Sequence, residues 1–425
     1  MEKKFRFISI IFIVLCFIFY GARFGYYYLK FNKKSSNNKS SEVLSSTIKN
    51  NNKIVTKGTG LYNNNGELVF KGKDVDNYLV YSGITWRIVK INTDDSITLI
   101  TDNNLTNLAF DKTSTDFLKS NINDWLNENG DNTGIFESKL SDKHKYLVPN
   151  TICLDNITNL NNISCKKKDH TKYVTLLNIA DYLNSKDTDS YINNTDSFWT
   201  VNKKDNSKVW YVNKGNVSED TSTSIHGIKA VVTLKNTIGK VSGKGTKENP
   251  YYIEKNNKSI SFGNYVKLGN DLYRVYDIEK DTVKLVNTGL IDDMQTRYIN
   301  YNKSEFNPLS NYSVAQYLNY TYYNSLAYKN NLVDCNYYTG DYNTDYKDIY
   351  SKKVTTKIGE LSIADINLDN QNSNYFLLNR HNNIVMSISH ENTKTTNKIK
   401  NTVCISKNNK FKGNGTENNP FELEV

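Results

Sequence analysis

Proline, cysteine and histidine are scarce in this chain of 425 residues, which contains four, five and five of them. No Cys-x2-Cys or His-x3-His pair occurs, so the usual zinc ligand sets are excluded. The run with calcium-loop spacing, Asp341 to Asp348, has Tyr346 where such a loop requires glycine. No Gly-x-Ser-x-Gly motif is present, and no pair of acidic residues recurs between the two halves of the chain. We therefore expect no catalytic residues, no metal and no cofactor.

Positive charge does not gather in one stretch, although the net charge is +10. The densest basic run is Lys166-Lys167-Lys168, and Asp169 and His170 follow it directly. Proteins that bind nucleic acid usually cluster basic and aromatic residues on one element. Nucleic acid is therefore not an expected partner.

The longest apolar run lies near the N-terminus, from Phe7 to Tyr20, and three basic residues precede it. No Ala-x-Ala cleavage site follows the run. Extended to Leu29 it has about 23 residues, which is enough to cross a bilayer. We expect an uncleaved transmembrane anchor over residues 1–34, a cytoplasmic N-terminus and an extracellular remainder, which makes the chain a single-pass protein of the cell membrane. A cleaved signal peptide is the alternative.

One motif, Gly-x-Gly-Thr-x-x-Asn-Pro, occurs twice, at Gly243–Pro250 and Gly413–Pro420. Two of the four prolines fall at its last position, and chance explains this poorly. A repeated ending indicates a repeated domain, in which the motif forms a turn that seats the last strand. We predict a polar linker over residues 35–56, module 1 over 57–255 and a divergent module 2 over 256–425.

The same elements recur in the same order inside both modules. Segments around Trp86-Arg87-Ile88 and Tyr273-Arg274-Val275 predict a β-hairpin in each. Apolar residues at helical spacing then predict a helix ending in Trp125-Leu126-Asn127 or Tyr317-Leu318-Asn319, with a serine at each N-cap. Because strands follow, the predicted fold class is α+β: a transmembrane helix and two tandem β-rich modules.

Further segments match between the modules. Leu177–Asp181 and Leu361–Asp365 share the pattern Leu-x-Ile-Ala-Asp and predict short helix starts. Ser197–Asn202 and Val209–Asn213 predict paired strands, and their counterparts in module 2 lack both tryptophans. Any binding surface built on these tryptophans is therefore in doubt for module 2.

This ordered set of motifs resembles a family of uncharacterised extracellular domains in anchored surface proteins of low-GC Gram-positive bacteria and their wall-less relatives. The resemblance spans nearly all of residues 60–254 and, less closely, 258–425. The family is distantly similar to C-type-lectin-like and formylglycine-generating-enzyme-like folds, so the resemblance implies such a fold for each module. It implies no particular chemistry.

Four residues are candidates for ligand binding: Arg87, Trp199, Trp210 and Tyr211. Exposed tryptophans would offer a sugar-stacking platform, but apolar-face positions favour core packing instead. Arg87 recurs as Arg274 beside an aromatic residue, which favours an ion pair or cation–π contact over ligand capture.

Each module also contains two cysteines, Cys153 and Cys165 in the first and Cys335 and Cys404 in the second. They would form disulfides in an oxidising exterior, or remain thiols that pack as small apolar residues.

These features together predict a membrane-anchored bacterial surface protein whose duplicated modules bind an extracellular glycan or protein. One alternative is a passive envelope spacer without a ligand, and another is an envelope enzyme of unknown chemistry.

Overall fold

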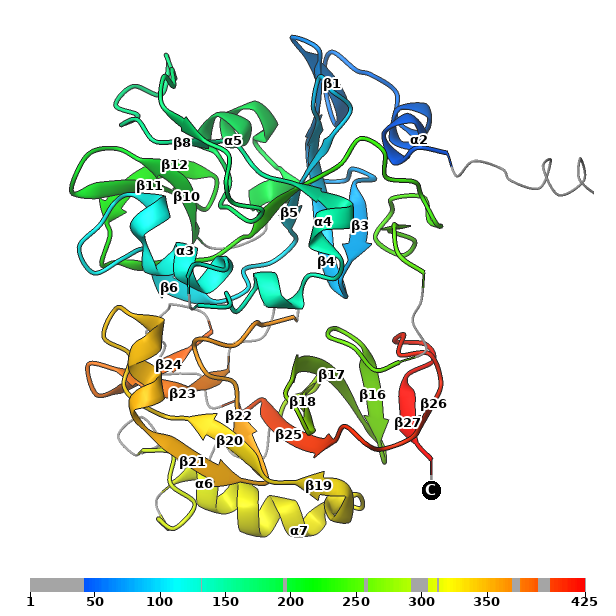
Figure 1. Cartoon of the computed structure of the whole chain (residues 1–425), viewed down its shortest axis with the longest axis vertical. Helices are drawn as coiled ribbons and strands as arrows, with labels where there is room; N and C mark the ends of the chain where they lie inside the picture. Colours follow the sequence, from blue (N-terminus) through cyan, green and yellow to red (C-terminus); the bar gives the residue numbers. More distant parts are fainter. Residues whose placement is uncertain are drawn as a thin grey trace, which may run out of the picture. The chain divides into compact units, whose positions relative to one another are not determined.

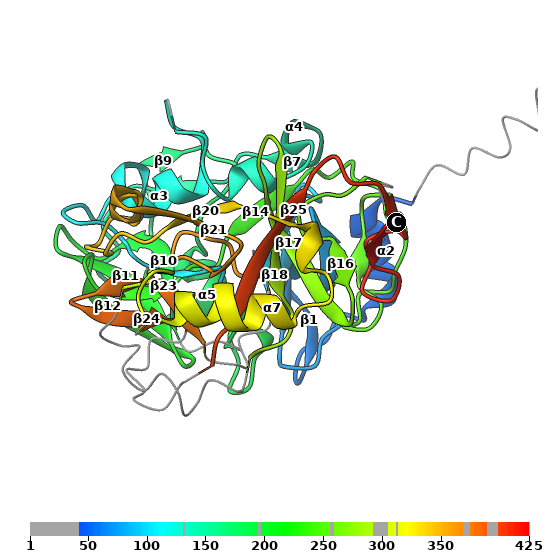
Figure 2. The same cartoon turned by 90° about the horizontal axis from the view of Figure 1, so that it is seen from below.

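The arrangement of strands and short helices is seen in a computed structural model (Figures 1 and 2). It describes residues 42–130, 132–193, 197–255, 259–291, 305–311, 313–368, 375–388 and 398–424. The chain from Leu44 onward forms one unit.

The predicted fold class is wrong in two respects. Strands hold 37% of the residues and helices 16%, so the fold is mostly β rather than α+β. In the part of the chain that the structure describes, no helix is both long enough and apolar enough to cross a membrane. The anchor predicted over residues 1–34 itself lies outside the described residues. The predictions of a transmembrane anchor and of a single-pass location in the cell membrane therefore lack support in the structure.

Helix α3 (Asn121–Leu126) shows why the predicted helix of module 1 stays short. Its N-cap prediction is confirmed, because the Ser120 side chain accepts a hydrogen bond from the Asn123 N–H. At the other end the Asn127 side chain donates a hydrogen bond to the Val174 carbonyl at 2.8 Å and accepts one from the Val174 N–H at 3.1 Å. These bonds hold the chain in an extended conformation at Asn127 and end the helix after six residues.

The predicted linker also differs from the structure. Residues 44–51 form helix α2, in which Leu44 and Ile48 are fully buried in the core of module 1. Their i, i+4 spacing puts both side chains on one helix face. The other helices are α4 (Lys143–Tyr146), α5 (Ile179–Ser185), α6 (Val314–Gln316), α7 (Tyr323–Ser325), η1 (Phe117–Lys119), η2 (Glu137–Lys139), η3 (Tyr191–Asn193), η5 (Tyr317–Tyr322), η6 (Lys329–Asn331) and η7 (Tyr346–Ser351).

The main sheet of module 1 has eight strands. Its order is β1-β2-β4-β5-β14-β7, and β3 lies between β4 and β15. Only β15 is parallel to its neighbour. The strands are β1 (Gly60–Asn64), β2 (Glu67–Lys71), β3 (Tyr78–Tyr81), β4 (Ile84–Ile91), β5 (Ile97–Thr101), β7 (Leu147–Val148), β14 (Val231–Leu234) and β15 (Tyr251–Tyr252).

Module 2 has a sheet with corresponding connections. Its order is β19-β25-β18-β17-β16-β27-β26, with β22 also paired to β25 and β27 parallel to β16. The strands are β16 (Tyr265–Leu268), β17 (Asp271–Ile278), β18 (Thr282–Asn287), β19 (Leu332–Val333), β22 (Ile358–Glu360), β25 (Asn401–Ser406), β26 (Phe411–Lys412) and β27 (Phe421–Leu423).

Smaller sheets complete both modules. In module 1 a five-stranded sheet has the order β12-β11-β10-β13-β6, and β8 pairs with β9. In module 2 the pairs are β20–β21 and β23–β24. These strands are β6 (Asn107–Ala109), β8 (Ile152–Cys153), β9 (Lys168–Asp169), β10 (Ser197–Lys203), β11 (Lys208–Asn213), β12 (Asn216–Thr221), β13 (Ile225–Gly227), β20 (Cys335–Tyr338), β21 (Lys353–Thr356), β23 (Phe376–His381) and β24 (Ile384–Ser387).

The repeated Gly-x-Gly-Thr-x-x-Asn-Pro motif leads into a parallel strand of each large sheet, β15 in module 1 and β27 in module 2. Its first glycine, Gly243 or Gly413, has a φ of 93° or 99° and leaves no room for a Cβ beside the proline carbonyl. The carbonyl of its second glycine accepts a hydrogen bond of 2.8 Å from Tyr78 in module 1 and Tyr265 in module 2. The prediction that the motif is a turn seating the last strand is confirmed.

The two modules share a hydrophobic core. The Trp125 indole N–H donates to the Ala364 carbonyl at 2.9 Å, and the Ala109 N–H donates to the Tyr342 hydroxyl at 2.7 Å. The large module 2 side chains that join the core of module 1 are Phe262, Tyr276, Tyr342, Tyr346, Ile349, Leu361, Ile363, Ile366, Tyr375, Leu377, Met386 and Ile388.

Backbone packs against backbone where the β3–β4 turn meets the start of module 2. A Cβ on Gly83 would lie 2.8 Å from the Cα of Gly263, and a Cβ on Gly263 would lie 2.6 Å from the Cα of Gly83. The Arg274 guanidinium donates to the Gly83 carbonyl at 2.8 Å across the same junction. This close contact is therefore possible only when both residues lack a Cβ.

The four cysteines in the described residues form two disulfides. Cys153 and Cys165 have Cα atoms 5.8 Å apart, and Cys335 and Cys404 have Cα atoms 5.9 Å apart. The second disulfide joins β20 to β25. Such bonds are typical of proteins that fold in an oxidising environment.

Candidate ligand-binding site

A large cleft lies in module 1 and has a volume of about 1130 Å³. Buried Arg87, Asp102 and Tyr191 lie at its floor. Its exposed lining contains both signs of charge, among them Lys186, Asp187, Asp189 and Lys247. A cleft of this size matches the upper end of small-molecule sites.

Arg87 is fixed in place by contacts within the protein. Its Nε donates to Asn77 at 2.6 Å and its Nη1 to Asp102 at 3.3 Å. The guanidinium lies 3.7 Å from the ring centroid of Tyr78 and 4.8 Å from that of Tyr191. Because its charge is already paired, Arg87 orders the cleft floor rather than offering a free cation. The structural interpretation of Arg87 therefore fits the geometry better than ligand capture.

A buried lysine lies behind this floor and recurs in module 2. Lys229 and Lys400 are each 1% exposed, and their Nζ atoms lie 5.4 Å from the Phe198 ring and 5.3 Å from the Tyr375 ring. Burial lowers the pKa of Lys229 to about 7, against the attraction of the Asp102 carboxylate. Sequence reasoning missed this residue, since nothing local distinguishes it from a surface lysine.

The predicted tryptophan platform is absent from the cleft. Trp199 is fully buried and donates its indole N–H to the Leu108 carbonyl at 2.9 Å. Trp210 is 8% exposed and donates to the Ile157 carbonyl at 2.7 Å. Neither residue lines the cleft around Arg87. The structure thus places both in the core and does not bring them to Arg87.

Tyr211 belongs to a different polar cluster on the five-stranded sheet. Its ring stacks on His226 at a centroid distance of 3.9 Å. His226 Nδ1 lies 3.0 Å from the Ser197 hydroxyl, and its Nε2 lies 3.0 Å from a carboxylate oxygen of Asp220. Trp199 packs against the same imidazole edge-to-face at 4.6 Å.

The environment keeps this cluster in defined protonation states. Burial lowers the pKa of His226, although Asp220 opposes the shift. Burial acts to raise the pKa of Asp220, but hydrogen bonds from Ser224 and His226 outweigh it and lower that pKa. A neutral imidazole therefore lies between a hydroxyl and a carboxylate. Asp220 and His226 are six residues apart, but Ser197 lies 29 residues from His226, so no local motif contains all three.

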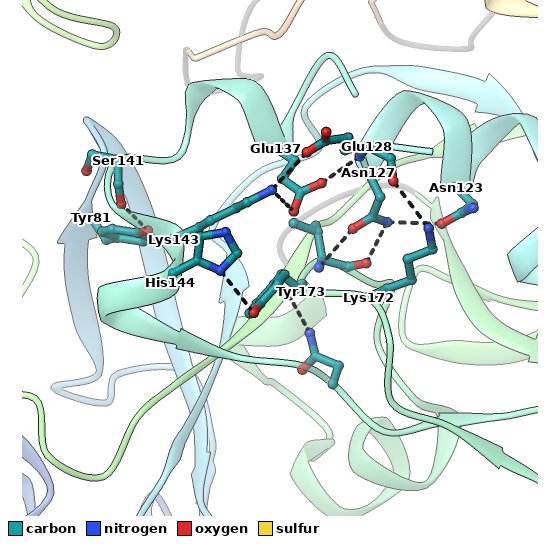
Figure 3. Close-up of polar contacts among 12 residues, drawn as sticks. Tyr81, Asn123, Asn127, Glu128, Glu137, Ser141, Lys143, His144, Lys172 and Tyr173 are labelled. Atoms are coloured by element: carbon teal, nitrogen blue, oxygen red, sulfur yellow. Dashed lines mark hydrogen bonds and ion pairs between the residues drawn. The ribbon is translucent and has the colours of Figure 1, made fainter. Parts of the chain in front are cut away.

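A third polar network, around Glu137, joins the chain after α3 to η2 and α4 (Figure 3). One carboxylate oxygen of Glu137 accepts from the Glu128 N–H at 2.6 Å, and the other accepts from Lys143 at 2.9 Å. Lys143 also reaches the Glu128 carboxylate at 3.2 Å. His144 next to it bonds the Tyr173 hydroxyl at 3.1 Å. Both Glu137 oxygens are satisfied, so this network is structural.

No protein-family model, no curated protein and no solved structure matches this chain. The resemblance to uncharacterised surface domains therefore stays a prediction, and the function must be argued from the geometry alone.

Proposed function

We propose that the protein is a binding protein and that the cleft around Arg87 takes a polyhydroxylated ligand such as a glycan. The observation that carries this proposal is a large polar cleft whose floor is held rigid by the Arg87–Asp102–Tyr78 contacts. A fixed floor lowers the entropy that a site loses when it binds.

The lining suits hydroxyl groups better than a charged ligand. The lining contains four lysines and four aspartates, so donors and acceptors are both present and their charges largely cancel. Asn103, Asn193 and Asn216 add amide groups that both donate and accept. A neutral sugar can bond to such a mixed surface without leaving a buried charge unpaired.

A glycan array probed with the full chain tests the proposal. We expect binding to one class of glycan, and we expect the Lys186→Ala/Lys247→Ala variant to weaken it about tenfold, since each lysine supplies charge-assisted hydrogen bonds. The matched control is Lys166→Ala/Lys167→Ala, which removes the same charge from an exposed loop outside the cleft. Silence across the array, or equal weakening by both variants, would contradict the proposal.

A second function, acyl transfer, is favoured by the Ser197–His226–Asp220 chain. The order hydroxyl, imidazole, carboxylate is that of a nucleophile, a base and an orienting group. Ser197 would attack an acyl carbonyl while its proton passes to His226, which then protonates the leaving group. Water would release the acyl group and regenerate the serine.

A fluorophosphonate probe distinguishes this function from a purely structural network. We expect mass spectrometry to find the label on Ser197, to lose it in Ser197→Ala, and to find it strongly reduced in His226→Asn. Ser207→Ala changes an exposed serine outside the cluster and should leave labelling unchanged. An unlabelled Ser197 in the folded wild-type chain would reject acyl transfer.

A further inference from the structure

A cavity of about 280 Å³ lies between the two modules. We propose that it is a site for a small organic cation carrying a primary ammonium group. Its lining includes Asp365 and the tyrosines Tyr276, Tyr338 and Tyr350 from module 2, and Lys139 from module 1. The site is separate from the cleft around Arg87 and does not depend on its function.

Asp365 has an equivalent in module 1, which is Asp181. Both follow the pattern Leu-x-Ile-Ala. The isoleucine N–H of this pattern donates to the side chain of Asn202 in module 1 and of Asn379 in module 2, at 2.8 Å in each case. The two carboxylates therefore occupy corresponding places in the two modules.

In module 1 a lysine ammonium fills the space in front of this carboxylate. Lys90 Nζ lies 2.8 Å from Asp181 and 2.8 Å from Glu67, and the Lys90 side chain is 13% exposed. A buried carboxylate is expensive unless such a partner neutralises it. Module 1 thus shows which group this position accepts.

In module 2 the residue that corresponds to Lys90 is an aspartate. Strands β4 and β17 have the same irregularity, between Ile88 and Lys90 in one and between Val275 and Asp277 in the other. Lys90 pairs with Thr98 across β5, and Asp277 pairs with Lys284 across β18. The lysine has moved to the neighbouring strand.

Lys284 lines the same cavity and its charge acts on Asp365, but its ion pairs are with other carboxylates. It is bound to Glu279 at 2.5 Å, and it lies 3.9 Å from Asp277. Lys139 of module 1 also bonds Asp277. Among the described residues no ion pair reaches Asp365, whose carboxylate accepts from the Ser362 N–H at 2.7 Å.

The cavity lies where the lysine side chain would be. Burial raises the pKa of Asp365, although the more distant Lys284 charge opposes the shift. A bound ammonium group would restore the ion pair of module 1 and favour the ionised carboxylate. The tyrosine rings add surfaces that attract an organic cation, and three carboxylates line the cavity against two lysines.

Cadaverine, which carries the alkylammonium of a lysine side chain, is the probe. In titrations of the full chain followed by calorimetry, we expect saturable binding of cadaverine and at least tenfold weaker binding of 1,5-pentanediol, its neutral analogue. Asp365→Asn should weaken cadaverine binding at least tenfold. The matched control is Asp181→Asn, which changes the corresponding carboxylate of module 1 and should leave cadaverine binding intact.

A second variant keeps the proposal testable if Asp365→Asn or the control folds poorly. Asp277→Lys/Lys284→Thr restores the Lys90–Thr98 pair of module 1 and should fill the cavity from within. We expect this variant to fold, to lose cadaverine binding and to have a raised melting temperature. Equal binding of both probes to the wild-type chain, no binding of cadaverine, or undiminished binding by the filled variant would overturn the proposal. None of these results would affect the glycan proposal.

Discussion

Residues 44–255 expressed without module 2 are expected not to form a cooperatively folded domain. Module 2 supplies twelve large side chains to the core that surrounds Trp125 and its neighbours. Exposing one large apolar side chain costs roughly 1.5–3 kcal/mol. A whole domain is stable by only about 5–15 kcal/mol. The loss of even half of these contacts therefore exceeds what module 1 can tolerate.

Thermal unfolding followed by near-ultraviolet circular dichroism measures this effect. Residues 44–425 should give one sharp transition, whereas residues 44–255 should give none and should bind a dye for exposed apolar surface. A sharp transition in residues 44–255, at a melting temperature close to that of the longer chain, would show that module 1 has a sufficient core of its own.

Replacing Lys229 with methionine is expected to stabilise the protein at pH 6 by about 2 kcal/mol, because exchange of a buried charge for an apolar group of similar length removes a desolvation cost. Lys229 is 1% exposed, and its pKa falls from 10.5 to about 7 in the folded chain. The unfolded chain therefore binds this proton more tightly than the folded chain does.

The same pKa shift gives the wild-type chain a pH dependence of stability that the Lys229→Met variant should lack. Below pH 7 Lys229 is charged in both states, so its cost is full and constant. Above pH 7 the folded chain releases the proton first, and the cost declines until the unfolded pKa of 10.5 is passed. Between pH 7 and pH 9 the advantage of Lys229→Met should shrink by about 2 kcal/mol.

Urea unfolding at pH 6, 7, 8 and 9 tests both statements. Lys57→Met, which changes an exposed lysine, should follow the wild-type pH profile. A Lys229→Met protein that is less stable than wild type at pH 6, or a difference that stays constant up to pH 9, would show that the buried ammonium is stabilised by its surroundings.

The sequence predicted features that depend on local spacing. Ser120 caps α3, Ser313 caps α6, and the Gly-x-Gly-Thr motif forms the expected turn. Each of these depends on a few neighbouring residues, so a single sequence contains the necessary information. The α+β class was wrong because strands dominate the fold. The helix of module 1 ends after six residues, where the long-range contact of Asn127 with Val174 stops it.

The candidate sites depended on contacts that no local pattern encodes. His226 meets Ser197 and Asp220 only because β10, β12 and β13 belong to one sheet. The correspondence of Lys90 with Asp277, and of Thr98 with Lys284, is visible only when the strand pairs of both modules are compared. Arg87 was found because it recurs beside an aromatic residue, but its ion pair with Asp102 needed the three-dimensional arrangement.

The mutual contact of Gly83 and Gly263 has a consequence for how such a protein changes over generations. A side chain on either glycine would meet the main chain of the other module, so the two positions cannot drift separately. Recombination that exchanged one module for an unrelated one would lose this fit as well as the Arg274 bond to Gly83. The two modules therefore depend on each other at this contact and can be exchanged only together.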